Sequence, residues 1–181
     1  MTIADPVTVR SMNFAVDGYV LNGASAITLT NTGSGGPAGA TIRVASAGGT
    51  ATIAAPITSS VAASIIGDGT LVLEGANAFA DYLIIEGGDL VLSGNSTTSV
   101  GTRVRVGWNG ITGAAGRLTV TDSASLNTAY LFAGDAAGVS GEIVQTGGTV
   151  TVSNRVGVGH YPNETATYTM SGGSLILTGS S

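Results

Sequence analysis

The residues of this chain that could do chemistry gather in three irregular segments of its C-terminal half. The segments read "GWNGITGAAG" (107–116), "GDAAGVSG" (134–141) and "GHYPNETA" (159–166), and each follows a short stretch that contains alternating apolar residues. The only Trp and the only His of the chain fall among them. An aromatic ring beside amides and carboxylates can pack on the apolar face of a sugar and orient it through hydrogen bonds. We therefore predict a binding strip made of Trp108, Asn109, Asp135, His160, Tyr161, Asn163 and Glu164.

An alternative interpretation is that these residues are ordinary solvated corners. Metal sites need several convergent ligands, and the chain has one His and no Cys. Asp135 and Glu164 near His160 would make a polysaccharide hydrolase or lyase conceivable, but such chemistry needs carboxylates at a set separation. Most acidic residues instead occur singly, beside glycine, as turn residues do. We predict no catalytic residue, no metal and no cofactor.

The composition limits the partners. Only 9% of the 181 residues are charged, lysine is absent, and the net charge is −5. An acidic chain without a basic stripe argues against nucleic acid as a partner. No run of about 18 apolar residues is present, so we expect no membrane insertion by this segment. The first ten residues lack the features of a signal peptide, so the chain is either intracellular or a piece of something longer, which the repeats favour.

Repeats decide the architecture that must position the binding strip. The phrases "GRLTVTDS" (116–123), "GEIVQTGG" (141–148) and "ATYTMSGG" (166–173) recur at one constant spacing without gaps. "GTLVLEG" (69–75) and "GDLVLSG" (88–94) follow each other at a shorter spacing. Apolar residues alternate within each phrase, which indicates half-buried strands, and no segment of ten or more residues has helical periodicity. Short strands and turns that recur in this way describe the coils of a β-solenoid.

We therefore predict an all-β fold, a parallel β-helix with three short strands per coil of about 19–27 residues. Roughly seven to nine coils would form one domain over residues 1–181. The coils are less regular over 1–60, shorter over 61–100 and about 25 residues long over 101–181. The glycines are expected at sharp turns that need a positive φ angle.

The alternation of apolar residues also predicts which polar side chains face outward and which face inward. Arg103, Arg105 and Arg155 flank inward-facing valines, so they should point outward and form weak surface pairs with turn acids. Gln145 falls at an inward position, so its amide needs a hydrogen-bond partner inside the solenoid.

Residues 67–96, "GDGTLVLEGANAFADYLIIEGGDLVLSGNS", resemble the autotransporter-associated β-strand repeat of bacterial surface passengers. The similarity lies in Gly-Thr-Leu-Val-Leu-Glu-Gly-Ala-Asn (69–77) and in Gly-Gly-Asp-Leu-Val-Leu (87–92). "GEIVQTGGTVTVSNRVGVGHYPNETATYTMSGGSL" (141–175) resembles a companion repeat of the same class of proteins. The resemblance implies a right-handed β-helix at the cell surface, or in the extracellular space, of a Gram-negative bacterium. The chain shows no alternating segments typical of a membrane barrel, so a passenger segment or a relative exported in another way is expected.

These observations favour a noncatalytic structural or adhesive module that spaces or presents a binding surface. Its expected partners are surface glycans or the surface of a host or neighbouring cell. One alternative is a subunit that stacks end to end into an extracellular fibre, because solenoid ends expose unpaired strand edges. The other alternative is a polysaccharide-active β-helix enzyme.

Overall fold

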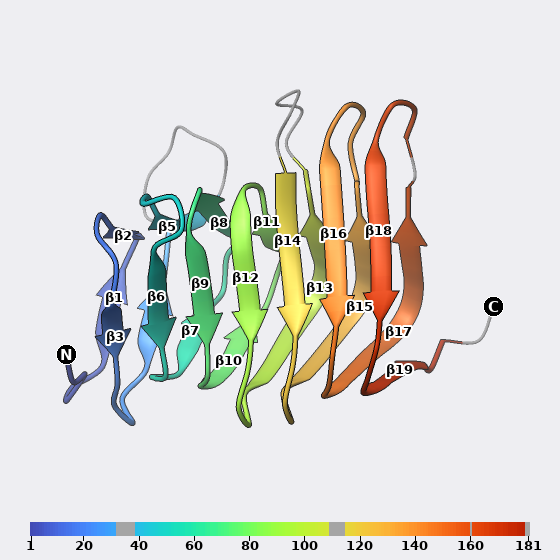
Figure 1. Ribbon diagram of the computed structural model, residues 1–181. Helices are drawn as coiled ribbons and strands as arrows, with labels where there is room; N and C mark the ends of the chain where they lie inside the picture. Colours follow the sequence, from blue (N-terminus) through green and yellow to red (C-terminus); the bar gives the residue numbers. More distant parts are fainter. Residues whose placement is uncertain (32–38, 109–114, 160, 180–181) are drawn as a thin grey trace.

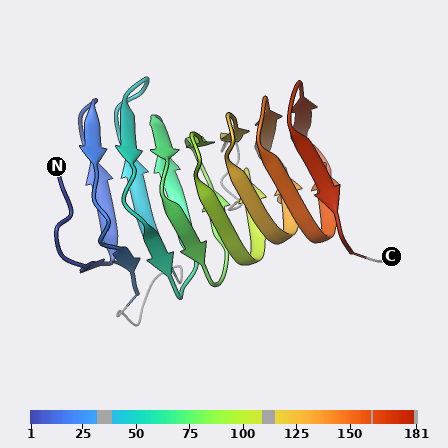
Figure 2. The ribbon, with the colours of Figure 1, turned by 90° about the horizontal axis from the view of Figure 1, so that it is seen from below.

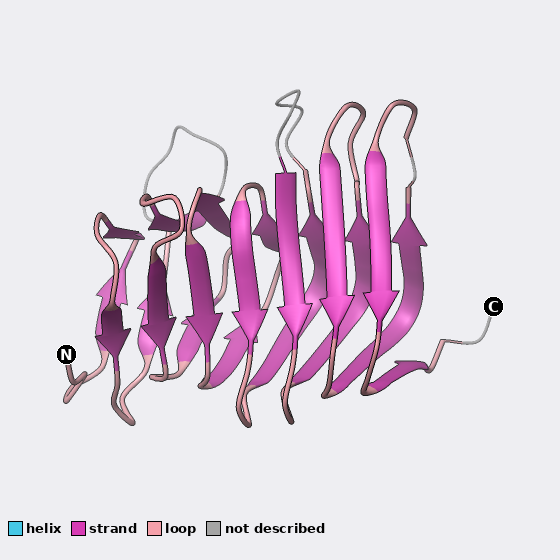
Figure 3. Ribbon diagram, in the orientation of Figure 1, coloured by secondary structure: helices cyan, strands magenta, loops and turns pink. Residues whose placement is uncertain are grey.

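The computed structural model describes residues 1–31, 39–108, 115–159 and 161–179. Strands joined by turns and short loops make up the described chain, as Figure 3 shows. No membrane-spanning helix occurs in this described part. Every strand pairing is parallel, so the chain coils in one direction and lays each strand beside its equivalent in the next coil. The fold is the predicted right-handed parallel β-helix, and the coils follow one another in sequence order (Figure 1).

The first four coils contain three short strands each. Their strands are β1 (Val7–Val9), β2 (Ser11–Phe14), β3 (Tyr19–Leu21), β4 (Ile27–Leu29), β5 (Ala40–Val44), β6 (Thr50–Ile53), β7 (Ile57–Ser59), β8 (Ala63–Gly67), β9 (Thr70–Leu73), β10 (Ala76–Phe79), β11 (Leu83–Ile85) and β12 (Gly88–Leu92).

The later coils contain one long strand and one shorter strand each. Their strands are β13 (Thr97–Val106), β14 (Ala115–Val120), β15 (Ser125–Ala133), β16 (Ser140–Gln145), β17 (Thr149–Val158) and β18 (Thr165–Met170), followed by β19 (Ser174–Leu177), which begins an eighth coil. The long strand β13 pairs with both β10 and β11, so it corresponds to two strands of the coil before it. The predicted three strands per coil thus hold as far as β12, and two of them then merge into one strand with an irregular step after Val100.

The strands form two sheets that enclose the core. Twelve strands build one sheet, and β3, β6, β9, β12, β14, β16 and β18 build the other. Figure 2, seen from below, shows the chain passing from one sheet to the other in every coil. The solenoid therefore has three outer faces. The first consists of β4, β7, β10 and the first halves of the long strands, and the second consists of β5, β8, β11 and the second halves of the long strands. The third is the outer face of the seven-stranded sheet.

The register confirms the repeats read from the sequence. Leu71 pairs with Leu90, its equivalent in the next phrase. Leu118, Ile143 and Tyr168 align across three coils at the constant spacing of the later repeats. Because like side chains lie over one another, each inward row buries its own copies, and most of these leucines, isoleucines and valines have no exposed surface.

The doubled glycines turn the chain between the two sheets. In three of the pairs the second glycine has a positive φ, 66° at Gly88, 63° at Gly148 and 81° at Gly173, whereas in Gly48-Gly49 the first glycine has it, at 72°. At Gly148 a Cβ atom would also overlap the carbonyl oxygen of Ala124 in the preceding coil. Only glycine combines this backbone conformation with so close an approach, so the predicted role of these glycines is confirmed.

Gln145 lies inside the solenoid, as its phase predicts, and is fully buried. Its Nε2 donates to the carbonyl oxygen of Ser174 at 3.0 Å, and its Oε1 accepts from the Tyr168 hydroxyl at 2.6 Å. Burial raises the pKa of Tyr168 to about 12, because the phenolate would lose its hydration. A buried amide with satisfied partners fixes the stacking of these coils rather than forming a site.

Candidate functional site

The predicted binding strip falls where the second halves of the long strands end. Trp108 follows β13, Asp135 follows β15, and Tyr161 lies just beyond β17. The chain turns there into the seven-stranded sheet, at the upper edge of Figure 1. Asn109 and His160 lie outside the described residues.

Asp135 is a buried carboxylate held by two arginines. Its side chain is 5% exposed, and its Oδ2 lies 2.9 Å from Nε of Arg105 and 3.9 Å from Nη1 of Arg103. The backbone N–H of Asp135 donates to the carbonyl oxygen of Gly107 at 3.0 Å, so the preceding coil fixes the position of the carboxylate. Because it lies closer to Arg105 than to Arg103, the carboxylate compensates mainly the charge of Arg105. It is therefore engaged in positioning the two arginines.

Arg105 joins Asp135 to two aromatic rings. Its guanidinium carbon lies 4.6 Å from the centre of the Trp108 ring and 5.2 Å from that of Tyr82. Planar guanidinium groups stack on aromatic faces at such distances, and the half-buried position strengthens the attraction. Arg105 consequently holds Trp108 and Tyr82, from two different coils, in one cluster.

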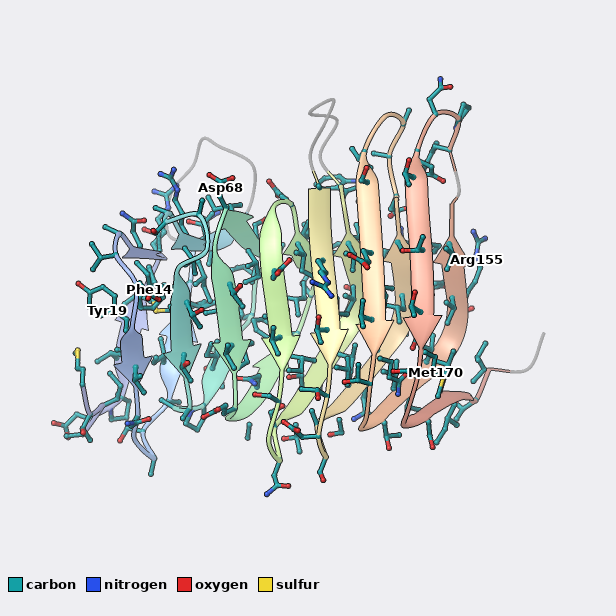
Figure 4. All side chains as sticks on the ribbon, viewed as in Figure 1. Phe14, Tyr19, Asp68, Arg155 and Met170 are labelled. Carbon is teal, nitrogen blue, oxygen red and sulfur yellow. The ribbon has the colours of Figure 1, made fainter. Side chains whose placement is uncertain are left out.

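Arg103 extends this cluster toward the C-terminal coils. Its guanidinium carbon lies 5.0 Å from the ring centre of Tyr130 and 5.1 Å from that of Phe132. The rings of Tyr130 and Phe132 are stacked, with 11° between their planes. Arg155 lies over Phe132 at 5.2 Å from the ring centre, and Figure 4 shows Arg155 at the C-terminal end of the solenoid. We call the surface formed by these side chains the arginine–aromatic face; it consists of Tyr82, Arg103, Arg105, Trp108, Tyr130, Phe132 and Arg155.

The pairing of β13, β15 and β17 brings the side chains of this face together. Arg103, Tyr130 and Arg155 align in one outward row, and Arg105, Phe132 and Gly157 align in the next row. A Cβ atom at Gly157 would overlap the Phe132 ring, so the glycine leaves the space into which that ring leans. The arginines point outward, as alternation predicts. Sequence reasoning missed Tyr82, Tyr130 and Phe132, although aligning "RVRVGW", "YLFAGD" and "RVGVGH" by phase places Tyr130 and Phe132 in the arginine rows.

Tyr161, Asn163 and Glu164 form a separate turn. The backbone N–H of Tyr161 donates to Oε1 of Glu164 at 2.6 Å, and Asn163 has a φ of 61°, a conformation that Asn tolerates better than most residues. Tyr161 is 46% exposed. The structure thus brings Trp108 and Asp135 together through Arg105, whereas the contacts of Glu164 stabilise the turn that carries Tyr161.

A groove adjoins the arginine–aromatic face on the side of the N-terminal coils. It has a volume of about 590 Å³ and runs across the outer surface of β5, β8 and β11. Thr41, Ser64 and Ile84, which align in one outward row, line it, and Tyr82, Arg105 and Trp108 stand at its C-terminal side. Glu86 and Asp81 also line it; Ser64 donates to Glu86 at 2.9 Å and Thr102 donates to Asp81 at 3.2 Å.

The two other outer faces carry different side chains. One outward row of the first face consists of small or hydroxyl-bearing side chains and one amide, at Thr28, Thr58, Ala78, Ser99, Asn127 and Thr151. On the seven-stranded sheet, Arg117 lies between Asp89 and Glu142, 3.9 Å and 3.3 Å from their carboxylate oxygens. Within the described residues, no group of three His, Cys, Asp or Glu side chains could hold a metal ion.

Comparison with known proteins gives one informative relationship. The chain is 32% identical over 148 residues to the protein named Adhesin BmaC autotransporter of Brucella suis biovar 1 (strain 1330). The match covers 82% of this chain and 4% of that protein, so the chain corresponds to a small section of its relative. The chain matches no protein-family model, and no solved structure gives a significant match.

The relationship agrees with the fold. An autotransporter relative indicates an extracellular or cell-surface location in a Gram-negative bacterium. The stacked parallel coils are the architecture that the resemblance of residues 67–96 implies. Sequence match and fold together identify the chain as a β-helical segment of the autotransporter passenger family.

Proposed function

We propose that this chain is a noncatalytic adhesive section of a surface passenger, in which a rigid β-helix presents the arginine–aromatic face to a target surface. The relationship to an adhesin supports an adhesive role at the cell surface. The observation that carries the finer proposal is the gathering of Tyr, Trp, Phe and Arg side chains on one of the three outer faces. The targets we propose are glycans or other components of a host or neighbouring cell surface.

Physical chemistry favours this face over the other two. Trp, Tyr and Arg are the residue types that contribute most binding energy at protein interfaces. Here they are held in place before binding, because each guanidinium stacks on rings from neighbouring coils and Asp135 fixes Arg105. A preorganised side chain loses less conformational entropy when a partner arrives.

Adhesion of coated beads tests the proposal. Fluorescent beads that carry the wild-type chain should adhere to at least one of a panel of cultured epithelial and Gram-negative cells. We expect Arg103→Thr/Tyr130→Thr to lower that adhesion at least tenfold, since it removes the middle of the arginine–aromatic face. The matched control is Arg117→Thr/Val91→Thr on the seven-stranded sheet, which should adhere as the wild type does. Equal adhesion by both variants would refute the assignment of this face.

End-to-end association is a second candidate, favoured by the two terminal coils. Rows that are buried in the middle of the solenoid emerge there: Tyr19 is 46% exposed at one end, and Met170 and Leu177 are 45% and 56% exposed at the other. Figure 4 shows Tyr19 and Met170 at opposite ends. A further coil, from the same chain or from a second copy, would cover these rows. Light scattering over a concentration series distinguishes growing particles from a monomer of constant mass.

A further inference from the structure

We propose that the groove beside Trp108 binds a neutral saccharide. The inference rests on the proposed adhesive function and gives one part of the surface a ligand class. The groove has a volume of about 590 Å³, within the usual range of small-molecule sites and sufficient for a few sugar rings. Tyr82 and Trp108 at one side supply apolar ring surface, while Thr41, Ser64 and the two carboxylates of Asp81 and Glu86 supply polar groups.

Charge argues against an anionic ligand. Asp81 and Glu86 both line the groove. Arg105 is its one cationic lining residue among the described residues, and the carboxylate of Asp135 lies 2.9 Å from that guanidinium. A uronic acid or another carboxylated sugar would therefore meet two like charges and an arginine that already has a partner.

Charge also argues against a cationic ligand. Aromatic rings that line a site beside carboxylates often attract ammonium or guanidinium groups. Here the guanidinium of Arg105 already lies 4.6 Å from the Trp108 ring centre and 5.2 Å from that of Tyr82. Arg105 already takes up the cation–π attraction of these two rings, so a ligand cation gains little from them, and the combination fits a ligand without net charge.

The polar groups match the hydroxyls of a sugar. Glu86 accepts a hydrogen bond from Ser64, and Asp81 accepts one from Thr102, and these bonds help to hold both carboxylates in place. A carboxylate has about four acceptor positions, so each can also accept from ligand hydroxyls. Such bonds are charge-assisted and are stronger than bonds between neutral groups. The apolar face of the same ring would pack on Trp108 or Tyr82.

Trp108 makes the test direct, because it is the only Trp of the chain. Its fluorescence is followed while the wild-type chain is titrated with neutral cellotetraose, maltotetraose or chitotetraose, and with anionic tetragalacturonate. We expect at least one neutral probe to change the emission saturably and tetragalacturonate to leave it unchanged. No response to any neutral probe, or a response to tetragalacturonate alone, would overturn the proposal.

Two variants locate the binding and its charge preference. Thr41→Arg fills the groove from an outward position of β5 and should weaken the neutral probe at least tenfold; Thr119→Arg, the matched control on the outer face of β14, should not. Asp81→Asn/Glu86→Gln keeps the shape of the groove and should weaken the neutral probe several-fold while allowing tetragalacturonate to bind. If Thr41→Arg binds as the wild type does, or if the double variant keeps its selectivity unchanged, the groove is not the site.

The bead assay separates this inference from the proposed function. Adhesion that depends on Arg103 and Tyr130 but is the same in wild type and Thr41→Arg would refute saccharide binding in the groove and leave the adhesive face standing. Saccharide binding by a chain that adheres to no cell would refute the adhesive function and leave saccharide binding in the groove standing.

Discussion

The coils of β4–β12 and those of β13–β18 bury the same inward rows but differ in the number of residues per coil. In the earlier group a short coil connects Leu71 to its paired residue Leu90. In the later group a longer coil connects Leu118 to its paired residue Ile143. The extra residues lie in the connections between the sheets. Ala76–Ile85 and Thr97–Val106 pair from end to end and have equal length, whereas the short step from Ile85 to Gly88 becomes the longer step from Val106 to Gly116. The inward rows nevertheless continue from one region into the other, because Leu90 pairs with Leu118.

The outer surface changes at the same boundary. Outward positions of β5 and β8 carry Thr41 and Ser64, while the equivalent positions of β13 and β15 carry Arg105 and Phe132. The inward rows therefore preserve the stack, while the lengths of the connections and the outward residues vary and can be adapted to binding.

The largest expected effect tests whether both regions depend equally on their inward rows. Leu71→Ala and Leu118→Ala remove fully buried side chains from the same row, one in each region. Each should lower the free energy of unfolding by about 2–5 kcal/mol, through lost apolar burial and the remaining cavity. Chemical denaturation followed by circular dichroism measures both. A loss below about 1 kcal/mol for only one of them, well under the usual cost of such a truncation, would show that the two regions are not equivalent.

A smaller effect separates backbone strain from close coil contact. Gly94 and Gly148 have almost the same φ, 62° and 63°, but a Cβ at Gly94 meets no atom within 4 Å, whereas at Gly148 it overlaps the Ala124 carbonyl. Gly94→Ala should cost about 1–2 kcal/mol from the left-handed conformation alone. Gly148→Ala should cost clearly more, because the neighbouring coil must also move. Thermal denaturation of the two variants compares them, and equal costs would contradict the close contact.

The smallest expected effect concerns the polar pair inside the C-terminal region. Burial raises the pKa of Tyr168 from 10.0 to about 12, so the folded chain holds this proton over a range in which the unfolded chain releases it. The resulting stabilisation is complete below about pH 10 and is lost as the pH rises toward 12. The free energy of unfolding should consequently fall more steeply between about pH 10 and 12 for the wild type than for Tyr168→Phe. Parallel pH dependences would contradict the buried hydroxyl.

Sequence reasoning found one half of the candidate site and missed the other. It selected Trp108 and Asp135 as unusual residues in turns, and it placed Arg103 and Arg105 on the outside. It did not find Tyr82, which lies in an earlier, shorter coil and reaches Arg105 only across the stack. It also treated acids in turns as solvated, whereas Asp135 is 6% exposed because two arginines and the preceding coil cover it.

The sequence by itself determined the coil: alternating apolar residues, doubled glycines and a constant repeat spacing specify which side chains face inward and which lie over one another. These properties are local or strictly periodic, so they can be read without coordinates; the inward amide of Gln145 is one example. Only the tertiary structure decided how outward side chains lean across coils of unequal length. Arg105 meets Trp108, Tyr82 and Asp135 from three different coils, and no spacing in the sequence encodes that meeting, because it depends on the direction of each side chain above the sheet.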